Sequence, residues 1–203
     1  LAFAVPLPFA ALPAAGEALM GMYREAQRND PVLASARASW RATQERAPQA
    51  LPESVRSKAR VVFQSTTARK PLAKSPRHLR ALMVGHLREE KSPQTLFGAA
   101  RRLAGRPDIL IDHIGEALDP ALGDEARATM ATVPNYRWLG GLPHETVRRR
   151  IQRAHLLIHA SRIEGGAHVI MEAAASGTPV LASAVDGNIG MLGADYAGYF
   201  PWN

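Results

Sequence analysis

The sequence predicts an α/β fold in which one parallel sheet carries helices on both faces, preceded by a short helical appendage. From residue 78 onward, short apolar runs that suit buried strands alternate with stretches whose apolar residues recur at helical spacing. The connections between these runs are short, and such alternation is typical of parallel sheets. We expect this domain to occupy residues 78–203.

Each element follows from a local signal. The first strand ends at a glycine, and the first helix has Ser92 as an expected cap and Pro93 in its first turn. The strand-like runs lie at residues 78–87, 108–115, 135–140, 154–161 and 178–183. The helical stretches lie at residues 92–105, 121–133, 143–154 and 166–177.

Three segments are expected before this domain. Residues 1–16 are apolar and interrupted by prolines, which suits the end of a secretory signal peptide and equally a start without defined structure. Residues 17–50 have helical apolar spacing, broken at Asp30 and Pro31, and resemble the beginning of mature outer-membrane efflux channel proteins. Residues 51–77 are predicted to be a basic linker with a short strand at VVFQS.

The charge of the chain is concentrated in one segment. Residues 54–80 hold eight Lys or Arg and no acidic residue, so the rest of the chain carries −1 of the total +7. A local excess without interleaved aromatic residues is more typical of a solvated linker than of a nucleic-acid surface. We therefore expect no nucleic-acid partner.

Other residue types exclude further classes of function. No run reaches the roughly 18 apolar residues of a membrane span, and the absence of cysteine excludes disulfides and thiolate chemistry. The closest histidine pair, His155 and His159, lies in an apolar strand-like run, which favours a structural role over metal ligation. We expect neither a membrane span nor a metal site.

The most informative stretch is residues 161–177, SRIEGGAHVIMEAAASG, which follows a strand-like run. Ligands of parallel α/β sheets bind at the carboxyl ends of strands, so Glu164 is expected at that edge. Gly165 and Gly166 would let the backbone approach a ligand closely, and the free N–H groups of the following helix would attract a phosphate.

A second glutamate lies within the same predicted helix. Glu172 follows His168 by four residues, so both share one helix face about a turn beyond the expected phosphate position. A carboxylate beside a phosphate is repelled, but it is useful if it accepts hydrogen bonds from sugar hydroxyls. The pattern therefore favours a site for a sugar linked to a phosphate.

These residues carry a family resemblance. Glu164 and Glu172, followed by Ala173 and the run SGTPV at 176–180, resemble the nucleotide-sugar signature of retaining glycosyltransferases of family 4, which have the two-domain GT-B fold. The resemblance implies a Rossmann-like sheet forming the C-terminal half of that fold. It also implies that Glu164 holds hydroxyls of the donor hexose and that Glu172 holds the nucleotide ribose.

A second segment supports the same family. The stretch VGHLREEK at residues 84–91 resembles the family segment whose Arg and Lys grip the diphosphate: Gly85 and Lys91 match, and His86 replaces the arginine. By resemblance, Lys91 binds the diphosphate, and Arg88 is the candidate that supplies the missing charge. Without the resemblance, both would be read as solvated charges at a helix entry.

A narrower resemblance covers the chain from about residue 52 to its end. The runs VGHLREEKSP, HIGEALDP, EGGAHVIMEA and GNIGMLGADYAGYFPW look like those of the glycosyltransferases that act as selenosugar synthase in selenoneine biosynthesis. This implies UDP-N-acetylglucosamine as donor, selenophosphate as the small anionic acceptor and a cytoplasmic location. It implies no cofactor and no metal, in keeping with the lack of an Asp-x-Asp motif.

The resemblance also implies that most of the acceptor half is missing. Residues 1–50 stand where an acceptor domain is expected, and we expect the donor domain to be truncated, so that a separate acceptor domain is needed. Two alternatives remain open: a non-catalytic nucleotide-sugar-binding remnant of a fused or broken gene, and an exported envelope helical module led by residues 17–50.

Overall fold

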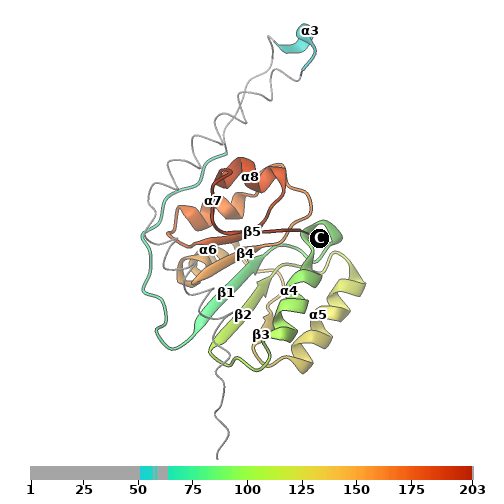
Figure 1. Cartoon of the computed structure of the whole chain (residues 1–203), viewed down its shortest axis with the longest axis vertical. Helices are drawn as coiled ribbons and strands as arrows, with labels where there is room; N and C mark the ends of the chain where they lie inside the picture. The colour runs from blue at the N-terminus through green and yellow to red at the C-terminus, as the bar shows by residue number, and fades with distance from the viewer. Residues whose placement is uncertain (1–50, 57, 59–63, 203) are drawn as a thin grey trace, which may run out of the picture.

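The computed structural model describes residues 51–56, 58 and 64–202 (Figure 1). The leader-like segment, the helical appendage and most of the predicted linker strand, residues 61–63, lie outside this part. Gln64 and Ser65, the last two residues of that predicted strand, have no strand structure.

Within residues 64–202 the strands form one six-stranded parallel sheet in the order β3-β2-β1-β4-β5-β6. The strands are β1 Leu79–Val84, β2 Ile109–Ile114, β3 Tyr136–Trp138, β4 Leu156–His159, β5 Val180–Ser183 and β6 Tyr199–Phe200. The five predicted strands and their parallel pairing are confirmed. The sixth, two-residue strand at the β5 edge was not predicted.

After the first strand, helices alternate with strands as expected, and one short helix precedes the sheet. They are α3 Glu53–Arg56, the 3-10 helix η1 Glu89–Lys91, α4 Pro93–Arg102, α5 Pro120–Thr132, α6 His144–Arg153, α7 His168–Ala174 and α8 Asp186–Leu192. Among these, α3, which falls in the predicted linker, η1 and α8 were not predicted. Asp119 caps α5 by accepting hydrogen bonds from the backbone N–H groups of Ala121 and Leu122.

Two apolar clusters place helices on both faces of the sheet, as predicted. Because strand side chains alternate, Ala81 and Met83 of β1 pack with α4 and α5, whereas Leu82 packs with α6, α7 and α8. Figure 1 shows α4 and α5 together beside β1 to β3, and α7 and α8 together beside β4 and β5. No helix in the described part of the chain is long and apolar enough to cross a membrane.

Candidate functional site

The loops after β1 and β4 meet at the carboxyl edge of the sheet. These strands are neighbours, and the backbone N–H of Arg162 donates to the Glu90 carbonyl at 2.8 Å. The contact brings Lys91 and Glu164 together, and the Lys91 ammonium forms an ion pair with Oε1 of Glu164. Two predicted site residues, 73 positions apart in sequence, are therefore direct partners.

Glu164 is held as a carboxylate by a small network. Its side chain is 9% exposed, and Nε2 of His159 lies 3.0 Å from Oε1. Ser161 Oγ lies 3.3 Å from the same histidine nitrogen. Burial alone would raise the pKa of Glu164, but hydrogen bonds from His159, Lys91 and Ser161 outweigh burial and hold it at about 2. His159, expected only as a structural residue, is thus part of this network.

Glycines shape the backbone around this pair. Gly166 has φ +154°, a conformation that side chains rarely adopt, and a Cβ at Gly165 would meet no atom within 4 Å. A Cβ at Gly187, in α8, would lie 1.8 Å from the Glu164 carbonyl oxygen, so α8 packs directly on the Glu164 loop. A Cβ at Gly85 would lie 3.7 Å from the aliphatic carbons of the Lys91 side chain.

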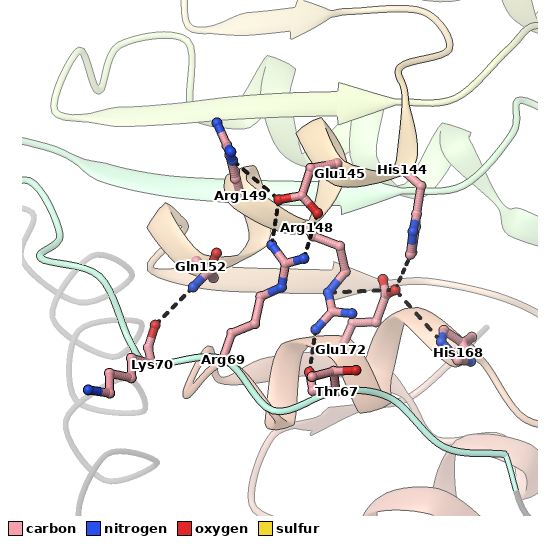
Figure 2. Close-up of polar contacts among 10 residues, drawn as sticks. All are labelled: Thr67, Arg69, Lys70, His144, Glu145, Arg148, Arg149, Gln152, His168 and Glu172. Carbon is pink, nitrogen blue, oxygen red and sulfur yellow. Dashed lines mark hydrogen bonds and ion pairs between the residues drawn. The ribbon is translucent and has the colours of Figure 1, made fainter.

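Glu172 is buried in α7 among three cationic or titratable side chains (Figure 2). Its Oε1 lies 2.6 Å from Nε2 of His144, 3.7 Å from Nε2 of His168 and 3.8 Å from Nε of Arg148. The predicted shared face of His168 and Glu172 is confirmed. His144 and Arg148 were not predicted as site residues, although their four-residue spacing on α6 places them on one helix face.

Arg88 does not join the Lys91–Glu164 pair. It lies immediately before η1 and forms an ion pair with Oε1 of Glu90 at 2.9 Å, both side chains being about two-fifths exposed. His86, which replaces the family arginine, accepts a hydrogen bond from the backbone N–H of Glu116 at 3.1 Å. A contact between Arg88 and a diphosphate therefore stays a prediction.

Ser92, which directly follows Lys91, corrects one expectation. It precedes Pro93 at the start of α4, but its side chain makes no capping hydrogen bond. Its φ of +47° is the only left-handed value among the non-glycine residues that the structure describes. The hydroxyl oxygen instead accepts a hydrogen bond from Nε1 of Trp202 at 3.1 Å, and the Arg162 guanidinium stacks 4.9 Å from the Trp202 ring centre.

This contact allows a stability prediction. Trp202→Phe keeps an aromatic ring beside Arg162 but removes the N–H donor, so the free energy of unfolding should fall by about 1 kcal/mol, a typical net value for one hydrogen bond. Urea denaturation measures this loss. The double variant Trp202→Phe/Ser92→Ala should lose less than the sum of the two single losses, and full additivity of the two single effects would contradict a direct bond between them.

The part of the chain that the structure describes contains no group of three or more His, Asp or Glu side chains that could hold a metal ion. The candidate site consists of ammonium, guanidinium, imidazole and carboxylate groups and of backbone around glycines. Such a set suits a ligand that carries both negative charge and hydroxyl groups.

Solved structures with this fold include several glycosyltransferases. The GtfA/B complex aligns with a TM-score of 0.56 and 22% identity, over 66% of this chain and 26% of that one. A glycosyltransferase from Rickettsia africae ESF-5 aligns with a TM-score of 0.55 and 18% identity, over 64% of this chain and 35% of that one. The pneumococcal O-GlcNAc transferase GtfA, in complex with UDP and GlcNAc, aligns with a TM-score of 0.51 and 20% identity, over 66% of this chain and 27% of that one.

These likenesses support the predicted Rossmann-like fold of GT-B glycosyltransferases, and the chain spans about a quarter to a third of each of those proteins. A comparison with curated proteins found no match. The family model for glycosyl transferases group 1 matches residues 64–200, well over half of the chain. The chain therefore belongs to the group 1 glycosyltransferases.

Proposed function

We propose that this domain binds a UDP-sugar donor, UDP-N-acetylglucosamine by resemblance, for transfer with retention to an acceptor, selenophosphate by resemblance. The observation that supports the proposal most is the buried ion pair of Lys91 and Glu164 at the ligand edge of the sheet. In this proposal the cation of the pair binds the diphosphate and the carboxylate accepts hydrogen bonds from sugar hydroxyls. The complex of pneumococcal GtfA with UDP and GlcNAc is consistent with such a donor.

In the proposed reaction the bond between the anomeric carbon and the diphosphate oxygen breaks, and the acceptor forms a new bond to that carbon. Negative charge builds on the departing UDP, and Lys91 stabilises it, with Arg88 as a second candidate. Glu164 orients the hexose through its hydroxyls while positive charge develops at the anomeric carbon. No metal or cofactor takes part in this scheme.

The remaining predicted donor contacts fit around these two groups. Gly85 lies beside Lys91, and Gly165 and Gly166 precede α7, where backbone can approach the diphosphate closely. Glu172 accepts hydrogen bonds from the nucleotide ribose, with His168 next to it. Acceptor binding requires a further domain in this proposal, and the cytoplasmic location stays a prediction.

Calorimetric titration of UDP and UDP-N-acetylglucosamine tests these roles. Glu172→Ala should weaken UDP binding roughly 10- to 100-fold, because a hydrogen bond to a charged acceptor contributes about 1.5–3 kcal/mol. Glu172→Gln keeps one acceptor and should lose less. Glu164→Ala frees Lys91 for the diphosphate, so UDP alone should bind no more weakly, whereas the complete UDP-sugar should lose affinity.

The outcomes separate the proposal from its alternatives. Absence of UDP binding would contradict it, and equal weakening of UDP by Glu164→Ala and Glu172→Ala would contradict the division of roles. A non-catalytic nucleotide-sugar-binding remnant would bind the donor but show no transfer to selenophosphate. An exported envelope module would bind neither ligand.

A further inference from the structure

The chain segment before the sheet lies across α6 and α7. We define residues 64–71 as the strap. Three side chains on one face of α6 hold it (Figure 2): Glu145 accepts two hydrogen bonds from Arg69, Arg148 donates to the Thr67 carbonyl at 2.6 Å, and Gln152 donates to the Lys70 carbonyl at 2.9 Å.

The strap also contacts the end of α7. The backbone N–H of Arg69 donates to the Ala175 carbonyl at 2.9 Å. A Cβ on Gly177 would lie 2.9 Å from the Pro71 ring, so this ring packs closely on the Gly177 backbone. The strap therefore joins the two helices that carry His144, Arg148 and Glu172.

Arg148 connects the strap to the candidate donor site. The residue is 4% exposed, and its Nη2 bonds the strap carbonyl. Its Nε is buried without a hydrogen-bond partner in the described structure and lies 3.8 Å from Oε1 of Glu172. A buried guanidinium is costly unless a counter-charge compensates it, and Glu172 is the carboxylate within ion-pair distance.

The contacts to Glu172 are asymmetric. His144, His168 and Arg148 all approach the same oxygen, Oε1. Because 3.8 Å is too long for a hydrogen bond, Arg148 restrains the carboxylate by charge and consumes none of its acceptor capacity. These contacts restrain the rotation of the carboxylate through Oε1, and in this inference Oε2 is the oxygen that accepts from a ligand hydroxyl.

We propose that Arg148, held in place by the strap, is a positioning residue for Glu172 and thereby determines the preference of the site for ribose over dideoxyribose nucleotides. The inference rests on the proposed ribose contact of Glu172. Without the Arg148 charge, Glu172 keeps its hydrogen bond from His144 and its contact with His168, but its rotation is less restrained, and ribose hydroxyls lose a fully oriented acceptor. Base and diphosphate contacts do not depend on this orientation.

The test compares the dissociation constants of UDP and 2′,3′-dideoxy-UDP, which share base and charge and differ only in the ribose hydroxyls. The wild-type chain should prefer UDP by roughly 10-fold or more, the equivalent of one hydrogen bond to a charged acceptor. Arg148→Gln retains a donor for the Thr67 carbonyl but removes the charge beside Glu172, so the preference should fall to roughly 2-fold or less. Arg148→Lys should recover part of it.

A matched control lies next to Arg148. Arg149 is largely exposed and contacts Glu145, so Arg149→Gln makes the same chemical change on the same helix and should leave the preference intact. A merely structural role for Arg148 predicts equal weakening of both nucleotides, with an unchanged ratio, and that result would overturn the inference.

Glu172→Gln separates a failure of the proposed ribose contact from a failure of the proposed positioning by Arg148. If the wild type shows no preference, or if Glu172→Gln keeps the full preference, the proposed ribose contact is wrong. If Glu172→Gln lowers the preference but Arg148→Gln keeps the wild-type ratio, the ribose contact stands and Arg148 does not position it.

Discussion

Lys91→Met is expected to lower the free energy of unfolding by about 3 kcal/mol, the lower end of the range for breaking a buried ion pair. The side chains of Lys91 and its partner Glu164 are largely buried, at 17% and 9% exposed. The substitution therefore leaves the Glu164 charge in a poorly solvated position. The lower end applies because His159 continues to donate to Glu164. Urea denaturation at neutral pH measures the loss.

Two further variants isolate the cause. Lys91→Met/Glu164→Gln removes both charges and should recover most of the lost stability, because no uncompensated carboxylate remains. Arg149→Met breaks an ion pair with Glu145 that is far more exposed, and should lose less than about 1 kcal/mol. If the double variant were no more stable than Lys91→Met, packing of the lysine chain rather than charge would explain the effect.

The inner strands β1, β2, β4 and β5 could be predicted because they are largely buried and read as short apolar runs. The last two elements, α8 and β6, lack such a signal in the sequence. Strand β6 has two residues, too few for a pattern, and α8 contains Gly187, Asn188 and Gly190, which have low helix propensity. Local propensity does not favour a helix here. The α8 helix packs on the Glu164 loop so closely that a Cβ at Gly187 would not fit.

The sequence singled out candidate site residues but few of the contacts between them. Spacing alone gave the shared face of His168 and Glu172, since helix geometry fixes it. The pairing of Lys91 with Glu164 depends on two loops that only the sheet order brings together. Arg148 meets Glu172 through packing of α6 on α7, and no local pattern encodes a contact between different helices.

The basic segment before the sheet shows a further limit. Its charges predicted a solvated linker, yet Arg69 pairs with Glu145 and two strap carbonyls accept hydrogen bonds from α6. Backbone carbonyls are the same in every sequence, so a segment held through them leaves little trace in its residue types.

His113, on β2, should make stability depend on pH. Its ring is fully buried, with Nε2 3.2 Å from the Gly85 carbonyl, to which it donates, and Nδ1 3.2 Å from the Tyr136 hydroxyl. Nδ1 is then unprotonated and accepts from Tyr136. Burial lowers the pKa of His113 to about 4, and the hydrogen bond to Gly85 opposes this only in part.

The sign of the effect follows from linkage. In the unfolded chain His113 takes up a proton near its ordinary pKa of about 6.5, whereas the folded chain resists protonation down to about pH 4. The contribution to stability is therefore complete above pH 6.5 and is lost as the pH falls toward 4. The shift corresponds to about 3 kcal/mol.

His113→Gln is the matched variant, because a glutamine amide can donate to the Gly85 carbonyl and accept from Tyr136 without titrating. We expect the stability advantage of the wild type over this variant to shrink by about 3 kcal/mol between pH 7 and pH 4, measured by urea denaturation. Acidic groups such as Glu164 are common to both chains and cancel in the difference. An advantage independent of pH would show that His113 is not buried in its neutral form.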